Sequence, residues 1–371
     1  MKAIVNTRDF VSELKKVMLA ANAKQVTSTP LANAIKIDVL SNGRIKFTSY
    51  NFTVAIETVL ECEQHEEGSV CVNAKSLFDV VSKCISDVIS ISTNGEICTV
   101  KSEKAVFSIP CMDSDSYSAL PKVGDISPIT VDVDALINAA SKVLYAVALD
   151  EKRPALQGVN IEIQNGTIDL VACDGFRLAN VKIQTNSDQN TNIIVPAETV
   201  NILSKILMDN ENDAQIFISR TFIIVKTENV SITSRLIAGP YMDWKKAIPN
   251  QSSIDCIFEK SKLVRAIDMA QTVQTKNGKI TGSIVFKING NVANVSLKSQ
   301  AGQFEDEIEF ETNGNLNMSI AFNPKYLLDA IRTVDSNEID LMIIGSLSPC
   351  FVKNKVDDSV INMVLPVRIK E

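Results

Sequence analysis

One short stretch of the sequence places an acidic and a basic side chain beside a turn: LVACDGFRLANV, Leu170–Val181. The pair Asp174-Gly175 stands between two apolar runs, and this arrangement predicts a tight β-hairpin. Phe176 and Arg177 follow at the tip of that hairpin, where an aromatic ring and a guanidinium could hold a partner. Taken alone, the stretch still favours the simpler interpretation that both are ordinary strand residues.

The rest of the chain offers little material for catalysis. His65 is the single histidine, and its setting EQHEEG is typical of a solvated loop. The eight cysteines stand at 62, 71, 84, 98, 111, 173, 256 and 350 and contain no C-x-x-C pair. No glycine-rich phosphate loop occurs, and the carboxylates are scattered. We therefore expect no enzyme, no metal site and no cofactor, with the cysteines acting as small buried apolar residues.

Composition indicates a globular protein of two or three domains. The chain has 371 residues, of which 45% are hydrophobic and 22% are charged. No apolar run approaches the roughly 18 residues that span a bilayer, and MKAIVNTRDF has no signal-peptide core. We expect a cytoplasmic protein without a membrane partner.

Internal repetition divides the chain into three similar units. The segments Val70–Ser92, Ile193–Ser219 and Ser319–Ile343 each predict a short strand, a capped helix and a further strand. Their helices start near Ala74, Ala197 and Pro324, spaced by 123 and 127 residues. A second helical pattern repeats at Phe10, Leu136 and Leu263, and the endings SYSALP and PYMDWKKAIP close the first two units. The predicted domains are 1–124, 125–251 and 252–371.

Each unit combines two helices with a majority of strands. The run Arg44–Glu61 alternates like half-buried antiparallel strands. Hairpin turns are predicted at Asn42-Gly43, Asn94-Gly95, Asn165-Gly166, Asn289-Gly290 and Asn313-Gly314. The fold class is therefore α+β, with helices packed on one face of antiparallel sheets.

Positive charge is concentrated on the helices. The net charge of the chain is −7, whereas the six predicted helices, 8–24, 74–86, 132–146, 197–210, 259–276 and 323–333, hold 14 Lys or Arg and 10 Asp or Glu. These helices thus carry +4 and the remainder −11. A weakly positive helical surface suits loose, nonspecific contact with a polyanion better than base readout.

Several motifs together resemble one family. RPALQGV and LVACDGFRLA are similar to the R-P-x-L-x-G-V and L-V-A-T-D-G-H-R-L-A motifs of the bacterial DNA sliding clamp, the beta subunit of DNA polymerase III. PYMDWKKAIP and the tail VLPVRI also match the family, and the resemblance covers essentially the full length. It implies a head-to-tail homodimer, a ring of six similar domains with helices lining the hole, and a processivity factor that encircles duplex DNA.

The resemblance also implies partners and a site. The partners are the catalytic subunit of DNA polymerase III, a clamp loader and other proteins that carry a clamp-binding peptide motif. The implied peptide cleft comprises Leu156, Cys173, Gly175, Phe176, Arg177, Leu178, Met242, Lys246, Ala247, Ser346, Met363, Val364, Leu365, Pro366, Val367 and Arg368. Phe176 replaces the usual His, Cys173 the usual Thr, and Met242 a common Pro, so the peptide preference is expected to differ.

Two further surfaces are expected. The DNA-facing cations are Arg8, Lys15, Lys24, Lys262 and Arg265. Phe107 and Ile109 lie either on an edge strand at the dimer interface or in an ordinary core strand, and the sequence favours neither. Two other function classes also stay open: a repeat-built β-rich structural protein that does not encircle DNA, and an enzyme on this scaffold.

Overall fold

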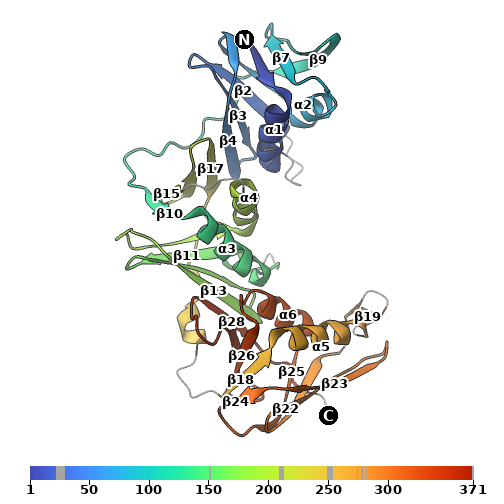
Figure 1. Ribbon diagram of the computed structural model, residues 1–371. Coiled ribbons are helices and arrows are strands. Elements are labelled where there is room, and N and C mark those ends of the chain that lie inside the picture. The colour runs from blue at the N-terminus through green and yellow to red at the C-terminus, as the bar shows by residue number, and fades with distance from the viewer. Residues whose placement is uncertain are drawn as a thin grey trace. The chain divides into compact units, whose positions relative to one another are not determined.

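The computed structural model describes residues 1–21, 30–149, 152–208, 213–248, 254–273, 275–276, 279–280 and 282–369. The chain divides into two compact units (Figure 1). The first contains Met1–Ile137 and Glu198–Leu236, and the second contains Asn138–Ala197 and Ile237–Glu371. Within the described ranges, no helix is long and apolar enough to cross a membrane.

The first unit is built on one antiparallel sheet. Its strand order is β10-β15-β16-β17-β4-β3-β2-β6-β9-β8-β7-β1-β5. The strands are β1 (Lys2–Asn6), β2 (Ala34–Leu40), β3 (Arg44–Tyr50), β4 (Val54–Glu61), β5 (Glu63–Glu66), β6 (Gly68–Asn73), β7 (Val88–Thr93), β8 (Ile97–Ser102), β9 (Ala105–Met112), β10 (Ile129–Val131), β15 (Ala214–Ile218), β16 (Phe222–Lys226) and β17 (Val230–Arg235).

Helices pack against this sheet. They are α1 (Thr7–Ala21), α2 (Ala74–Val81), η1 (Pro30–Asn33), α4 (Ala197–Leu207, in this unit from Glu198) and the start of α3 (Val133–Val143). Phe10, Leu14 and Val17 form the buried stripe of α1, and the Phe10 ring meets Phe47 of β3 edge-on at 4.9 Å. The side chain of Asn6 caps α1 by accepting the backbone N–H of Arg8 at 2.9 Å.

The second unit contains a larger and a smaller antiparallel sheet. The larger has the order β14-β11-β12-β13-β28-β27-β26-β18-β24, the smaller has the order β23-β22-β21-β25, and β19 pairs with β20. The strands are β11 (Gly158–Gln164), β12 (Thr167–Cys173), β13 (Arg177–Gln184), β14 (Thr191–Pro196), β18 (Ile254–Glu259), β19 (Thr275–Lys276), β20 (Lys279–Ile280), β21 (Ile284–Asn289), β22 (Val292–Lys298), β23 (Gln303–Glu309), β24 (Glu311–Thr312), β25 (Asn317–Phe322), β26 (Glu338–Ile343), β27 (Cys350–Lys353) and β28 (Val360–Val364).

The helices of the second unit pack against the two sheets. They are α5 (Lys260–Thr272), α6 (Pro324–Arg332), the end of α3, and the short turns η2 (Leu144–Ala146), η3 (Pro154–Gln157) and η4 (Trp244–Ala247). α5 and α6 lie side by side (Figure 1). The core beneath them includes Phe258, Phe286 and Phe322, and the Phe258 ring stacks on Phe310 at 4.6 Å. Pairing of β13 with β28 joins residues that the sequence assigns to different domains.

Most of the predicted elements are confirmed. All six helices form, although α2 ends at Val81 instead of Ser86, and residues 22–24 of the first helix lie outside the described ranges. β3 and β4 pair as antiparallel strands. Four Asn-Gly pairs join paired strands, but the prediction at Asn313-Gly314 is wrong. That turn connects β24, which pairs with β18, to β25, which pairs with β21, so it links two sheets.

Asp340 is a buried carboxylate within the larger sheet. It is 4% exposed, and its Oδ1 atom has no hydrogen-bond partner among the described residues. Burial and the nearby carboxylate of Asp255 raise its pKa from 3.8 to about 6, although Lys353 and Lys355 act in the opposite direction. The folded state therefore binds this proton more tightly than the unfolded state, and ionised Asp340 destabilises the fold.

We predict that Asp340→Asn raises the free energy of unfolding by on the order of 2 kcal/mol at pH 7.5. The gain should shrink to less than half as the pH falls from about 6 to about 4, since the carboxyl is then mostly protonated in the folded wild-type protein and no longer buries a charge. Urea unfolding at pH 7.5 and pH 4.5 measures both values. An equal gain at both pH values would show that the ionised carboxylate is not the cause.

Candidate functional site

The Asp174-Gly175 hairpin forms as predicted. β12 and β13 pair antiparallel up to Cys173 and Leu178, and residues 174–177 make the turn. The Oδ1 atom of Asp174 accepts the backbone N–H groups of Phe176 at 2.8 Å and Arg177 at 3.0 Å. Gly175 has φ +91°, a conformation that L side chains rarely adopt. The turn therefore uses Asp174 to accept two backbone N–H groups and Gly175 to adopt a positive φ angle.

Arg153 supports the turn from outside. Its Nη2 donates to the backbone oxygen of Asp174 at 3.0 Å. A Cβ atom added to Gly175 would lie 2.9 Å from Nη1 of Arg153, so a side chain there would displace the guanidinium as well as strain the backbone. Close approach of Arg153 is thus a second reason for glycine at this position.

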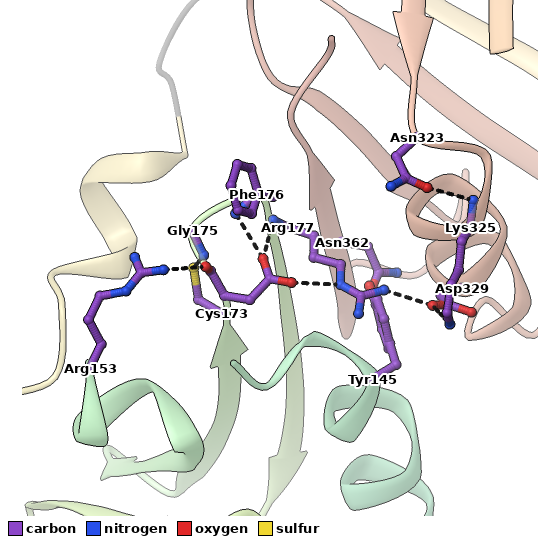
Figure 2. A network of polar contacts seen from close by, with 11 residues as sticks. Tyr145, Arg153, Cys173, Gly175, Phe176, Arg177, Asn323, Lys325, Asp329 and Asn362 are labelled. Carbon is purple, nitrogen blue, oxygen red and sulfur yellow. Dashed lines mark hydrogen bonds and ion pairs between the residues drawn. The ribbon is translucent and has the colours of Figure 1, made fainter. Parts of the chain in front are cut away.

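Arg177 is buried beneath the hairpin instead of extending from its tip. The residue is 8% exposed, its Nε donates to Asp174 Oδ2 at 3.1 Å, and its Nη1 donates to Asp329 Oδ2 at 2.7 Å (Figure 2). The guanidinium carbon lies 4.3 Å from the ring centroid of Tyr326 and 5.1 Å from that of Tyr145. Two carboxylates and two aromatic faces therefore compensate the loss of hydration of this cation.

The same network continues to β28 through Tyr145. The Tyr145 hydroxyl donates to Oδ1 of the fully buried Asn362 at 2.8 Å, and Nδ2 of Asn362 donates to Thr333 Oγ1 at 2.9 Å. Burial raises the pKa of Tyr145, so this hydroxyl keeps its proton and stays a donor. Lys325 adds a further contact to Asp329 Oδ2 at 2.9 Å. The hairpin is thereby fixed to α6, η2 and β28.

An apolar cluster lies next to the hairpin. It comprises Val171, Cys173, Leu178, Trp244, Phe351 and Met363, with Tyr241, Ala247, Ile248, Met342, Ile344, Ile361 and Leu365 packed against it. The Trp244 indole donates to Glu162 Oε2 at 3.3 Å, which holds η4 over the sheet. Burial raises the pKa of Cys173, so its thiol remains neutral.

Phe176 is the exposed part of the site. It is 58% exposed, and its ring lies 6.4 Å from that of Tyr326 at an interplanar angle of 32°. The backbone N–H of Leu365 donates to Phe176 O at 2.8 Å, so the tail after β28 runs beside the hairpin. An exposed aromatic face, a buried cation and an apolar cluster form a surface suited to an apolar peptide side chain.

The predicted cleft residues separate into groups. Cys173, Leu178 and Met363 belong to the apolar cluster, and Ala247 and Leu365 pack against it. Gly175, Phe176 and Arg177 form the hairpin. Val364 is instead buried in the core under α5 and α6, since it points to the face of β28 opposite to Met363. The other predicted residues do not belong to the apolar cluster: Leu156 is buried on η3, Pro366 is half-buried, and Met242, Lys246, Ser346, Val367 and Arg368 are exposed.

Comparison with known proteins agrees with this geometry. The central-domain model of the DNA polymerase III beta subunit matches residues 130–243, the C-terminal-domain model matches 245–368, and the N-terminal-domain model matches 1–121. The chain belongs to the DNA polymerase III beta subunit family.

Individual relatives match over the whole length. The beta sliding clamps of Staphylococcus epidermidis and Staphylococcus aureus are each 29% identical over 97% of both chains. The crystal structure of the DNA polymerase sliding clamp from Bacillus subtilis superposes with a TM-score of 0.94, covering 100% of both chains at 26% identity. These similarities support a sliding clamp over a repeat-built structural protein.

The predicted DNA-facing cations lie on two helices of the clamp fold. Arg8 and Lys15 are exposed on α1, and Lys262 and Arg265 are exposed on α5. Lys262 forms an ion pair with Glu259 at 2.9 Å, and this contact raises its pKa. Arg265 lines a surface pocket with Asp306 and Glu307. Lys24 lies outside the described residues.

The predicted dimer residues lie on β9, which has one open edge. β9 pairs with β8 along its length and with β6 only at Cys111 and Met112, so the other edge of residues 105–110 meets no described strand. Ile109 is buried in the core, whereas Phe107 is half-buried. The open edge of β9 agrees with an edge strand at a dimer interface, whereas the buried Ile109 side chain agrees with an ordinary core strand. The structure therefore does not decide between these two predictions.

Several residues of the site were not identified from the sequence. Tyr145, Tyr326, Asp329 and Asn362 bind Arg177 or its neighbours from distant segments, and no local pattern marks them. Trp244 carried a usable signal, because it is the only tryptophan and lies in the repeated closing segment. Arg153 lies directly before the RPALQGV proline and was part of a motif that was recognised but not assigned to the turn.

We predict that Asp329→Asn lowers the free energy of unfolding by about 1–3 kcal/mol, since it removes one of the two anions that neutralise the buried Arg177. Asp268→Asn is the matched control, because Asp268 pairs with Arg332 in an exposed contact and should cost below about 1 kcal/mol. Urea unfolding of the three proteins measures the difference. Equal costs for both variants would contradict the role assigned to Asp329.

Proposed function

We propose that two copies of this chain close into a ring around duplex DNA and tether the replicative DNA polymerase during synthesis. The observation that carries the proposal is similarity to beta sliding clamps over 97% of the chain. In such a ring each copy contributes three similar domains, for which we propose the boundaries 1–124, 125–251 and 252–371. Two copies then supply six domains, and a head-to-tail contact between copies closes the ring.

Two open strand edges support the homodimer. On β9, one edge of residues 105–110 meets no described strand, and the exposed Lys101, Glu103 and Lys104 beside it carry a net charge of +1. β23 is the outer strand of its sheet and carries exposed Glu305, Asp306, Glu307 and Glu309. An open edge with basic neighbours is complementary to an open edge with acidic side chains, so the β9 edge of one copy is suited to pair with the β23 edge of another.

Topology supports DNA retention without strong phosphate contacts. Ion pairs within the protein offset part of the helix charge, as for Lys16 with Glu13 at 2.7 Å and Lys262 with Glu259 at 2.9 Å. Arg8 and Lys15 on α1 are exposed and form no ion pair with a described residue, so they would supply weak sequence-independent attraction. Weak contacts leave a closed ring free to slide, since each phosphate contact adds salt dependence and resistance to movement.

The hairpin and the apolar cluster support a role as a docking site for partner peptides. Phe176 offers an exposed aromatic face, Met242 and Val367 are exposed, and Leu365 and Pro366 are half-buried. The proposed occupants are short segments of the polymerase catalytic subunit, the clamp loader and other clamp-binding proteins. A protein with this role acts in the cytoplasm on DNA, and it needs no catalytic residues because it contributes only tethering.

Reversing the charges beside β9 should weaken the dimer. For Lys101→Glu with Lys104→Glu, we expect the dimer dissociation constant to rise at least about tenfold at low salt, equal to about 1.4 kcal/mol. Mixing this variant with one that carries Glu305→Lys and Glu307→Lys should restore association. Sedimentation velocity measures both, with Lys182→Glu and Lys205→Glu as a control of equal charge. A dimer unaffected by the first pair would mean that these edges do not meet.

Retention on DNA should depend on the shape of the DNA. Protein assembled by a clamp loader on a nicked circular plasmid should stay bound through gel filtration in about 0.5 M salt, where nonspecific phosphate contacts are largely screened. Cutting the plasmid once should release the protein, because a ring slides off a free end. Retention on linear DNA at the same salt would instead indicate direct binding and would exclude encirclement.

A further inference from the structure

A second candidate docking site lies in the first compact unit. A pocket of about 470 Å³ has its floor on the face of β2, β3, β4, β17 and β16 that is opposite to α1, and residues 117–123 form one wall. The volume is within the range of about 300–1,000 Å³ typical of ligand pockets. The Tyr117 hydroxyl donates to Thr48 O at 3.3 Å and holds the wall against the sheet.

Cations dominate the charge around this pocket. Four lysines line it, Lys36, Lys46, Lys122 and Lys226, against two carboxylates, Asp38 and Glu57. The net charge of the lining is therefore +2, in a chain whose total is −7. An anionic group is favoured here although most of the molecule repels it.

The charges of the pocket are not all neutralised. Lys46 contacts Glu57 at 3.4 Å and Asp38 at 3.9 Å, and Lys36 contacts Asp38 at 3.5 Å. Lys122 and Lys226 are exposed, and neither forms an ion pair with any described residue. Both carboxylates thus have cationic partners, whereas Lys122 and Lys226 are paired with no described carboxylate and can bind a ligand. The Nζ atom of Lys226 also lies 5.9 Å from the ring centroid of Phe217.

Hydroxyl and apolar groups complete the lining. Thr48, Thr233 and Ile224 are buried at the floor, Ser231 is half-buried, and the half-buried Leu120 and Val123 add apolar surface. A nucleic-acid strand would bring a phosphate every few ångströms against Asp38 and Glu57. A peptide can instead alternate carboxylates with apolar side chains, which matches the mixed lining.

Internal repetition gives this pocket a counterpart. Wall residues 117–121 belong to SYSALP, the segment that closes the first sequence unit as PYMDWKKAIP closes the second, and Lys122 and Val123 follow it directly. In the second segment, Trp244 and Ala247 cover the apolar cluster beside the hairpin. In the first, the equivalent segment covers a cationic and polar surface. The closing segment thus covers an apolar surface in the second repeat and a surface with lysine side chains in the first.

We propose that this pocket is a second docking site, which takes an acidic linear segment of a partner protein. Lys122 and Lys226 bind its carboxylates, and Leu120 with Val123 contacts the apolar side chains between them. The inference is independent of the hairpin site and of DNA encirclement. The small area of the pocket implies weak, reversible binding.

Fluorescence anisotropy of the full chain tests the site with a labelled ten-residue peptide in which Asp and Glu alternate with Leu. We expect saturable binding at 50 mM salt, at least tenfold weaker binding of the same peptide with Asn and Gln, and at least tenfold weaker binding to Lys122→Glu with Lys226→Glu. Both lysines are exposed, and Lys182→Glu with Lys205→Glu serves as the charge-matched control. Absence of saturable binding, or equal affinity for the amide peptide, would overturn the proposal.

Two further arms identify the location and the class of ligand. Phe176→Ala should leave the affinity for the acidic peptide unchanged, and loss of binding in this variant would place the peptide at the hairpin instead. A single-stranded oligonucleotide of ten nucleotides should not displace the peptide at equal concentration. Displacement by the oligonucleotide would identify the pocket as a nucleic-acid site and refute the peptide assignment.

Discussion

Burial of the Arg177 guanidinium is the constraint on which the candidate site depends. A cation that is 8% exposed must be neutralised within the protein, and its partners come from the hairpin, from α6 and from η2. Asp174 has two tasks, because one carboxylate oxygen caps the turn and the other binds Arg177. The conformation of the turn is therefore coupled to the position of α6. Phe176 lies between Gly175 and Arg177, and the contacts of Arg153 with the turn and of Arg177 with Asp329 hold this exposed residue in place.

The charge distribution of this protein favours weak contacts with DNA. The helices carry more positive charge than the strands and loops, yet several of their cations are paired internally, such as Lys325 with Asp329 and Arg332 with Asp268. Paired surface charges contribute little to stability, but they reduce the field that a polyanion meets. A tether that must slide benefits from this reduction, since its hold on DNA comes from closure. The acidic remainder of the surface disfavours adventitious contacts with nucleic acid.

The sequence predicted local features well and long-range partners poorly. The six helices, four of the five Asn-Gly hairpins and the Asp174-Gly175 turn follow from residue types and spacing within a few positions. Asn313-Gly314 failed because the same dipeptide can join strands of two different sheets, and only the pairing of those strands decides. Arg177 seemed to be a tip residue, since its partners Asp329, Tyr326 and Tyr145 come from segments far away in the chain. Val364 was assigned to the cleft with its neighbours, although alternation along β28 turns its side chain into the core.

The two open edges, on β9 and on β23, differ in sequence and in charge. When two different surfaces meet head to tail, an open assembly always has one unoccupied surface of each type at its ends, so further copies can add. A contact between two identical surfaces instead ends with the dimer. Only the angle through which each copy turns the next decides whether the second addition closes the assembly or the chain continues as a filament. In the proposed ring, the rotation between successive copies is therefore what limits growth. A substitution far from either edge that changes this rotation would convert the proposed closed dimer into an open polymer while leaving both contact surfaces intact.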